Sequence, residues 1–598
     1  MRLIVPYSNE LSVADTRLVR LTEFLGGQCE LLPLGVGETL SPEFVDKYVE
    51  TKDSCFVVNP SAIPQLMSDK LFLQELAPYL TSRFPFVLIH NVSIDPFSAS
   101  ILSAFSEGSL RSVQSVEGSG LDYKIASEHK SICGAFSGLS VGPFHETNAQ
   151  VLTQNPDAKA VRTYITLGGQ PFFASTPSKR AEVFFLASAN IADLDENVRP
   201  ELLPEQFPQL IPPAMFIRYA FRDECWRPNQ PHATLLIDDP LLRKNYGFLN
   251  FESLLGLMDE HNFHTTIAFI PHNWQRNSPK VIRLFQTRPD RYSICFHGND
   301  HTAAEFAVKD TGLLNAMVTA AKERMDVHLK NTAIPCAKVM VFPQGKFSRN
   351  AMNVLKAQNF NAAANSGPYP LGEDVRFTLR ENLQPAILKY GGFPLFLRKY
   401  VRKIELQDIA FNLFFGKPLL VVEHHEIFKD PESLTLLIRR IHALAPEIVW
   451  SNLETTVQNS YLKQWSPDGV LRIRAFSNTG SIKNTSDAIV RCCVQWPGCS
   501  EIPVEALLLD GVPVPVDESG NSDVQLTFDL PPAESRNFSV VYRDDFDLSH
   551  ANRRLQWAAK VFFRRRLSEI RDNYLSKSSH LLSLAKAFQR RLPKVIND

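Results

Sequence analysis

The 598-residue sequence lacks any uncharged apolar stretch of about 18 residues, which excludes an ordinary membrane-spanning helix. Its N-terminus has only a short apolar run before acidic residues, so we expect no secretory signal peptide. The nine cysteines are too few and too irregularly spaced for a disulfide scaffold. Net charge is also nearly absent, at -1, and no nucleic-acid partner is expected. These absences predict a cytoplasmic protein that reaches a membrane only peripherally, at its inner face.

The first third of the chain has the pattern of an α/β domain. Residues 1–200 alternate short apolar runs with amphipathic stretches, which is typical of βα units around a parallel sheet. Gly168 and Gly169 separate two alternating runs, as a hairpin turn does. A Pro-rich linker is expected over residues 201–230.

The pattern of residues 1–200 resembles the glutamine-amidotransferase-like domains found beside carbohydrate-active modules. A nucleophile in such a domain would occupy a tight turn between a strand and a helix. Cys29, Cys55 and Cys133 do not lie in a sequence of that kind. We therefore expect the domain to have the fold without the amidase activity.

The remaining chain divides into three regions. Residues 231–455 contain about seven βα units whose strands end in polar residues, which predicts a distorted seven-stranded (β/α) barrel. Residues 466–545 alternate strands with turn signals and predict a β-sandwich. Residues 546–598 carry 12 Lys and Arg against 4 Asp and Glu, a local charge of +8, with apolar residues at helical spacing. This tail is expected to be a basic amphipathic helix that packs on the protein by one face, or that contacts a membrane surface or an anionic partner.

Histidine is concentrated in the predicted barrel, where residues 231–450 hold 10 of the 15. His297 and His301 are four residues apart directly after an apolar strand, so a helical turn there would place both imidazoles on one face. Asp238 and Asp239 end another strand of the same barrel. Two imidazoles and one carboxylate form a ligand set that leaves a zinc ion open to water, and a second carboxylate could serve as a base.

The segments LLIDDP, HGNDH, VFPQG and VVEHHE, in this order, resemble the motif series of the polysaccharide deacetylase (NodB-homology) family. The resemblance covers residues 231–455 and implies a metal-dependent hydrolysis of N-acetyl groups on sugars. It implies that Asp238 is the general base and that Asp239, His297 and His301 bind the metal, most often zinc. It also implies a backbone N–H near Gln344 that stabilises the oxyanion.

The general acid of the family is a later histidine at a strand end, and here His424 and His425 both qualify. Because side chains alternate along a strand, only one of them can point into the barrel, and we favour His425. The family's third motif begins with an arginine that orients the base, but Val341 stands at that place. Arg398, near a later strand, is the candidate replacement. Gly298 stands where the family has Ser or Thr.

The predicted function is therefore a carbohydrate deacetylase that acts on an N-acetylated glycan. The missing arginine at position 341 leaves one alternative open, a non-catalytic barrel that binds a glycan or a partner in envelope or exopolysaccharide biosynthesis. A second alternative keeps the metal and hydrolyses another C–N amide bond.

Overall fold

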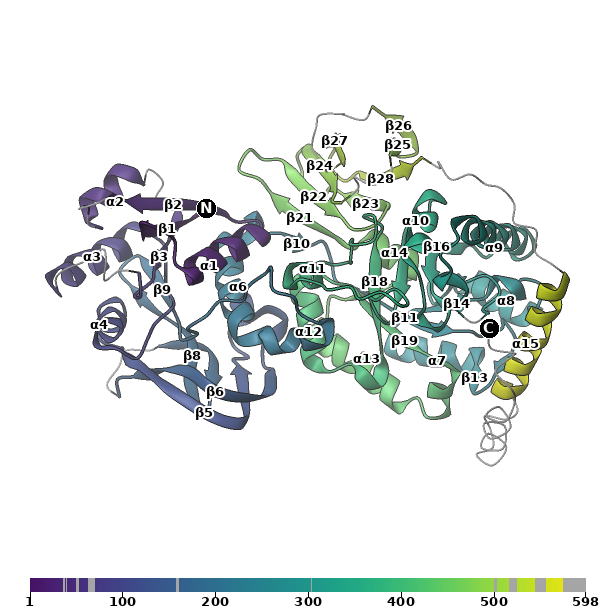
Figure 1. Ribbon diagram of the computed structural model, residues 1–598, viewed down its shortest axis with the longest axis horizontal. Coiled ribbons are helices and arrows are strands. Elements are labelled where there is room, and N and C mark those ends of the chain that lie inside the picture. Colours follow the sequence, from purple (N-terminus) through teal and green to yellow (C-terminus); the bar gives the residue numbers. More distant parts are fainter. Residues whose placement is uncertain are drawn as a thin grey trace.

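The computed structural model describes residues 1–35, 38, 40–49, 53–62, 70–156, 161–302, 304–498, 503–515, 524–543 and 555–573. Figure 1 shows an N-terminal α/β unit at one end, a barrel at the other, and a pair of β-sheets packed on the barrel beside its junction with the first unit. Separate clusters of buried apolar side chains form the cores of these units. The chain is therefore built from several cores, as its length predicts.

The N-terminal unit is a nine-stranded sheet of order β2-β1-β3-β4-β9-β8-β7-β5-β6. Its strands are β1 (Arg2–Ser8), β2 (Gln28–Leu34), β3 (Ser54–Val58), β4 (Phe86–Ile89), β5 (Leu110–Ile125), β6 (Ser140–Gln154), β7 (Arg162–Leu167), β8 (Gln170–Ser178) and β9 (Ala181–Leu186). Its helices include α1 (Val13–Phe24), α2 (Pro42–Tyr48), α3 (Lys70–Arg83), α4 (Pro96–Phe105) and α5 (Lys130–Cys133). The first five strands of that order pair in parallel, and the others pair antiparallel.

The hairpin predicted at Gly168 and Gly169 is confirmed, since Leu167 of β7 pairs with Gln170 of β8. Both glycines have positive φ, 57° and 79°, which this two-residue turn requires. Burial raises the pKa of the Cys29 and Cys133 thiols to about 12, so neither is an activated nucleophile.

The prediction of a linker over 201–230 is wrong, because most of this segment forms helix α6 (Phe207–Phe221). The helix is apolar on nearly all sides and lies in the core of the N-terminal unit. Pro213 removes the N–H that would bond to the carbonyl of Gln209, and the N–H of Ala192 donates to that carbonyl instead, at 3.0 Å. An outside donor thus satisfies a carbonyl that proline leaves free inside the helix.

Residues 232–450 form a closed, seven-stranded parallel barrel of order β14-β15-β16-β17-β18-β19-β11, in which β11 also pairs with β14. The predicted barrel fold is thereby confirmed. Its strands are β11 (His232–Asp238), β14 (Thr265–Phe269), β15 (Tyr292–His297), β16 (Cys336–Val341), β17 (Ala362–Asn365), β18 (Leu395–Tyr400) and β19 (Leu419–Glu423). The short strand β20 (Val449–Trp450) adds to β11 from outside. The helices of this region are α7 (Phe251–His261), α8 (Pro279–Thr287), α9 (Thr311–Thr332), α10 (Arg349–Ala357), α11 (Leu379–Leu383), α12 (Leu406–Phe415), α13 (Glu432–Leu444) and α14 (Leu453–Gln458).

Alternate residues of each barrel strand belong to two different apolar clusters. Leu236 of β11 and Val422 of β19 share one cluster with small side chains from neighbouring strands, among them Ala268 and Ala364. Leu235 and Val421 belong to the other cluster, together with the surrounding helices. The first cluster is therefore the barrel interior, where a narrow barrel needs small side chains.

Two sheets pack over a third core. One has the order β10-β21-β22-β24-β27 and the other β23-β28-β25-β26. Their strands are β10 (Arg227–Pro228), β21 (Tyr461–Trp465), β22 (Leu471–Ala475), β23 (Thr479–Lys483), β24 (Val490–Trp496), β25 (Val504–Leu509), β26 (Val512–Val514), β27 (Val524–Leu530) and β28 (Ser535–Tyr542). This sandwich begins at Tyr461, before the expected start at residue 466, and β10 joins it from the expected linker.

The described part of the basic tail is helix α15 (Leu555–Asn573), drawn in yellow at the barrel end of Figure 1. It packs on the barrel, but its apolar residues Leu567 and Ile570 are exposed while Arg565 is buried. The helix packs by one face, as expected, but this face combines the apolar Val561 with the charged Arg565, and Leu567 and Ile570 lie outside it. Residues 546–554 and 574–598 lie outside the described residues, and contact of the tail with a membrane or anionic partner stays a prediction. Within the described part of the chain, every helix is too short or too polar to span a membrane.

Candidate metal centre

Asp238 is the last residue of β11 and points into the barrel, two residues beyond Leu236. Both of its carboxylate oxygens accept hydrogen bonds from the Arg398 guanidinium, at 2.6 and 2.8 Å. Burial alone would raise the pKa of Asp238, but the charge of Arg398 holds it below its ordinary value. The carboxylate is thus ionised, and its bidentate contact with the guanidinium fixes its orientation.

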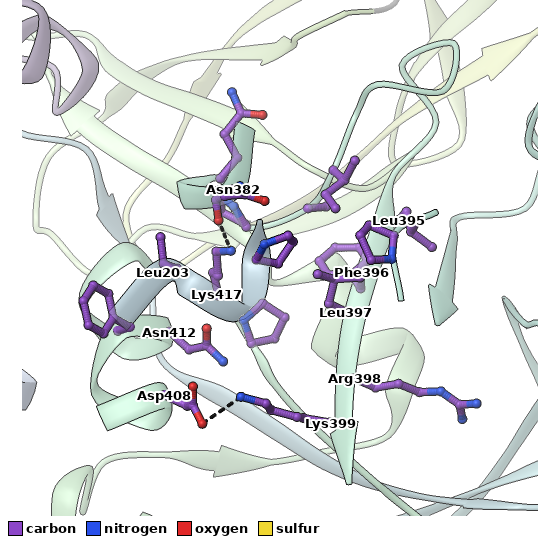
Figure 2. A pocket seen from close by; sticks show the side chains of 18 of the residues that line it. Leu203, Asn382, Leu395, Phe396, Leu397, Arg398, Lys399, Asp408, Asn412 and Lys417 are labelled. Atoms are coloured by element: carbon purple, nitrogen blue, oxygen red, sulfur yellow. Dashed lines mark hydrogen bonds and ion pairs between the residues drawn. The ribbon is translucent and has the colours of Figure 1, made fainter. Parts of the chain in front are cut away.

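Arg398 reaches Asp238 because side chains alternate along β18. Figure 2 shows Arg398 leaving the strand away from Lys399, whose ammonium pairs with Asp408 of α12 at 2.7 Å. Lys399 and Asp408 border a cavity of about 150 Å³ outside the barrel. The structure therefore places a guanidinium beside the first aspartate although Val341 occupies the expected position for arginine.

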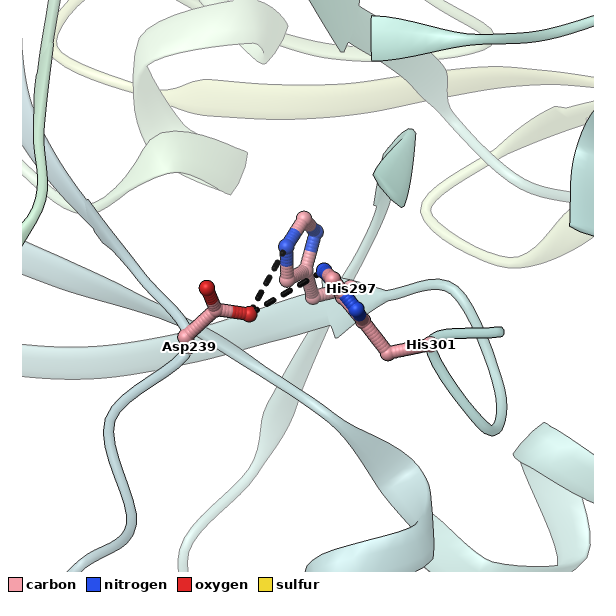
Figure 3. Close-up of side chains that lie close together, drawn as sticks. All are labelled: Asp239, His297 and His301. Carbon is pink, nitrogen blue, oxygen red and sulfur yellow. Dashed lines mark ion pairs between the residues drawn. The ribbon is translucent and has the colours of Figure 1, made fainter. Parts of the chain in front are cut away.

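Asp239 turns away from the strand with φ of 80°, a conformation that is rare for a residue other than glycine. Its Oδ1 lies 3.5 Å from Nε2 of His297 and 3.1 Å from Nε2 of His301, as Figure 3 shows. One ligand atom from each of the three residues falls within 4.8 Å of the others. The structure therefore brings together the three residues that the sequence predicts as metal ligands.

Asp239 and His301 are in the protonation states that metal ligands need, whereas the carboxylates of Asp238 and Asp239 outweigh burial and raise the pKa of His297. His297 lies within hydrogen-bond distance of the Val341 carbonyl through Nδ1, at 3.0 Å; a proton on Nδ1 leaves the Nε2 lone pair free. Burial lowers the pKa of His301 to about 4, so this imidazole is neutral at pH 7. Oδ1 of Asp239 is buried and accepts no hydrogen bond from any described residue. A cation is the partner that this carboxylate and these two imidazoles lack.

The loop between His297 and His301 is held by a residue that the motif analysis missed. Glu305 is buried, and its carboxylate accepts hydrogen bonds from the backbone N–H groups of residues 299–302, at 2.8–3.2 Å. Gly298 has φ of +64°, and a Cβ there would lie 2.1 Å from Oε1 of Glu305. Glycine therefore replaces Ser or Thr here because the Glu305 carboxylate occupies the space. Glu305 follows His301 by four residues, but no family motif or periodicity marks it.

The two candidate acids face opposite ways, and the structure reverses their expected orientation. His424 follows interior Val422 by two residues, stacks on Tyr400 at 5.9 Å between ring centroids, and acts electrostatically on Asp238. His425 is buried outside the barrel, in edge-to-face contact with Tyr246 and 3.9 Å from Asp572 of α15. The expectation that His425 is the inward-facing residue is therefore wrong. The two histidines do lie on opposite sides of the strand, but alternation alone does not determine which of them faces inward.

Gln344 lies in the 3-10 turn η7 (Pro343–Gly345) with φ of 57°. It lines a cavity of about 70 Å³ with Asp239 and His301. Helix α15 covers this cavity and contributes Arg564, Arg565, Ser568, Arg571 and Asp572 to its wall. The predicted oxyanion residue is thus near the predicted metal ligands, and the C-terminal helix is an additional part of the site that sequence motifs did not indicate.

No protein-family model matches the chain, and no curated protein sequence is similar to it. Solved structures do match the barrel segment. Most of those compared are described as deacetylases or family 4 carbohydrate esterases, and one is described only as a cytoplasmic protein from Salmonella typhimurium. A carbohydrate esterase from Streptococcus mutans is 18% identical, covers 38% of this chain and 86% of its own, and has a TM-score of 0.24. A peptidoglycan N-acetylglucosamine deacetylase is 15% identical, covers 39% and 90%, and has a TM-score of 0.25.

A third match is a family 4 acetyl xylan esterase from Clostridium thermocellum, in complex with a cobalt ion. It is 13% identical, covers 37% of this chain and 87% of its own, and has a TM-score of 0.22. The resemblance predicted from the motifs is thus found among solved structures. At such identities and TM-scores it concerns one segment of the chain, so function has to be inferred from the site itself.

Proposed function

We propose that the protein is a metal-dependent hydrolase that removes the acetyl group from an N-acetylated sugar. The observation that carries this proposal is the Asp239, His297 and His301 cluster beside a second carboxylate, Asp238, which Arg398 holds in place. An ionised carboxylate that is fixed in orientation next to an open set of metal ligands is the arrangement that metal-dependent hydrolysis of an amide requires.

Asp239, His297 and His301 would hold the metal. A divalent cation there would supply Lewis-acid polarisation of the acyl carbonyl and of the attacking water. Asp238 takes a proton from that water, which adds to the carbonyl carbon. Arg398 keeps the Asp238 carboxylate ionised and aimed into the barrel, since the pKa of Asp238 is held below its ordinary value. Backbone N–H donation near Gln344 stabilises the negative charge that develops on the carbonyl oxygen.

His424 is our choice for the general acid, because it faces the barrel interior with Asp238. Protonated His424 gives its proton to the amine nitrogen as the C–N bond breaks, so that the products are acetate and a free amino sugar. His425 instead positions helix α15 through its contacts with Tyr246 and Asp572.

The decisive experiment compares metal content and acetate release in matched variants. The wild-type protein should contain near-stoichiometric divalent metal by mass spectrometry and should release acetate from acetylated chitooligosaccharides or an acetylated surface glycan. Asp239→Ala and His297→Ala should lose the metal. Asp238→Asn should keep the metal and lose about 10²–10⁴-fold in rate, as expected for removal of a general base.

Asp326→Asn is the matched control, because Asp326 is exposed on α9, away from the site. Full metal content in both Asp239→Ala and His297→Ala would refute the proposed metal centre. Absence of hydrolysis by metal-loaded wild type on a broad panel would favour the non-catalytic alternative. Release of ammonia or of an acid other than acetate would point to another C–N amide bond.

A further inference from the structure

Helix α15 buries a charged face against the barrel. Arg565, Glu569 and Asp572 recur at helical spacing and are 4%, 9% and 4% exposed, whereas Leu567 on another face is 66% exposed. Burying charge while exposing leucine is unfavourable unless each buried charge has a partner. The partners of these three residues therefore indicate what the helix does.

Two of the three buried charges have partners within the chain. Glu569 forms an ion pair with Arg276, with Oε2 2.6 Å from Nη2. Asp572 accepts a hydrogen bond from the Tyr246 hydroxyl at 2.7 Å and pairs with Arg571 at 2.6 Å. These contacts fix the rotation and position of the helix on the barrel.

Arg565 is the exception, because no hydrogen bond or ion pair joins it to any described residue. Its Nε is buried without an acceptor, and its side chain lines the 70 Å³ cavity that contains Asp239 and His301. It acts electrostatically on both, lowering the pKa of each. A buried guanidinium thus points into the metal cavity without an acceptor.

The charge of the cavity favours an anion once the metal is present. A divalent ion on Asp239 leaves one positive charge there, Arg564 and Arg565 add two more, and Arg571 is compensated by Asp572. These three positive charges in a small cavity repel one another unless an anion lies between them. The planar guanidinium of arginine matches the paired oxygens of a phosphate or a carboxylate.

We propose that Arg565, with Arg564 beside it, binds an anionic group of the substrate next to the metal, so that the enzyme acts on acetylated sugars bearing phosphate or carboxylate. This inference rests on the proposed deacetylase function for its substrate, but the anion site is testable without any turnover. Helix α15 is then a specificity element, since it supplies the recognition of charge that the barrel alone does not provide.

Binding of inorganic phosphate to the metal-loaded, full-length protein tests the site by titration calorimetry. Arg565→Gln should weaken phosphate binding about tenfold or more, the loss expected for one charge-assisted hydrogen bond, while metal content stays unchanged. Arg565→Lys should bind phosphate with intermediate affinity, because lysine keeps the positive charge but lacks the paired N–H donors of the guanidinium. Arg566→Gln is the matched control, since its side chain is 52% exposed on the same helix.

A substrate panel completes the test with an N-acetylated sugar phosphate, an N-acetylated uronic acid and a neutral acetylated oligomer. Wild type should favour one of the anionic substrates over the neutral one, and Arg565→Gln should raise KM for that substrate with little change for the neutral one. A preference for the phosphate or for the carboxylate distinguishes the two sources of negative charge.

Equal phosphate affinity in wild type and Arg565→Gln, with helical content retained, would overturn the anion site. Equal hydrolysis of neutral and anionic substrates would also overturn the anion site. This result would leave the proposed deacetylase function intact. Loss of phosphate binding in Arg565→Gln without hydrolysis of any acetylated sugar would refute the deacetylase and keep the anion site.

Discussion

Asp238 and Arg398 form a buried ion pair between two strands of the barrel, β11 and β18. A pair of this kind gives little net stability relative to apolar residues, but removal of one partner leaves the other charge buried and uncompensated. The contact therefore serves to hold a carboxylate in one orientation inside the barrel.

Arg398→Gln should lower the free energy of unfolding by about 3–5 kcal/mol at pH 7, measured by urea denaturation. The pKa of Asp238 is lowered in the folded protein, so the pair stabilises it at pH values above the ordinary carboxyl pKa of about 3.8. This contribution is lost as the pH falls through the lowered folded pKa, and the difference between variant and wild type should shrink there. Arg402→Gln, at an exposed position in the next turn, should leave stability unchanged. The prediction would be contradicted if Arg398→Gln and the wild type had the same unfolding curve at pH 7.

The residues of the metal cluster could be predicted from sequence because each follows a recognisable strand, and parallel strands deliver their ends to one rim. Arg398 could be suggested only because Val341 stands where an arginine that orients the base was expected. Arg565 and Tyr246 carry no such signal, because their importance comes from contacts between segments far apart in the chain.

In the loop after β15, Gly298 and the buried Glu305 stand in place of the Ser or Thr that the motif resemblance leads one to expect. Glu305 collects the backbone N–H groups that precede and follow His301, and Gly298 leaves room for its carboxylate. The loop is thereby shaped by a buried carboxyl group, which holds His301, the second proposed metal-binding histidine, in place.

Gly298→Ser should disrupt this loop, because its Cβ would meet Glu305 at 2.1 Å and Pro343 at 2.4 Å at a φ of +64°. We expect a loss of about 1–3 kcal/mol in unfolding free energy and weaker metal binding, measured by denaturation and by competition with a chelator. Gly256→Ala in α7 is the control, since its Cβ meets nothing within 4 Å and alanine favours a helix. Unchanged metal affinity in Gly298→Ser would show that the loop tolerates the side chain.

At the scale of the element, the prediction for α6 was wrong, and the charged residues on the packed face of α15 were not predicted. The predictions for both segments were based on local composition. In α6, buried surroundings outweigh the helix-breaking tendency of Pro212 and Pro213. In α15, the ion pair of Glu569 with Arg276 and the hydrogen bond from Tyr246 to Asp572 set the buried face, which apolar spacing alone does not specify. Tertiary contacts decided both cases, and no local pattern contains them.

In the whole molecule, the proposed metal-binding residues and the arginines of the cavity wall lie on separate units. Asp239, His297 and His301 belong to the barrel, while Arg565 and Asp572 belong to a helix that follows the sandwich in the chain. Buried contacts of Tyr246 and Arg276 join the two. The metal site should therefore survive without the helix.

A chain lacking residues 555–598 should keep its metal and lose thermal stability, because Tyr246 and Arg276 each lose a buried partner at a cost of about 1–3 kcal/mol. Calorimetry and metal analysis of the purified protein measure the two effects. The full-length Glu569→Gln/Asp572→Asn variant should reproduce much of the change in Tm. Complete loss of metal from the truncated chain would mean that the barrel alone cannot hold it.

Helix α15 lies after every barrel strand in the order of synthesis. Domains generally fold in the order in which they leave the ribosome. We therefore expect the three proposed ligands to assemble before the arginine wall is translated, while the rim of the barrel is open to a metal ion. Docking of α15 would then cover the site, so the proposed metal should bind most readily during translation and more slowly once the chain is complete.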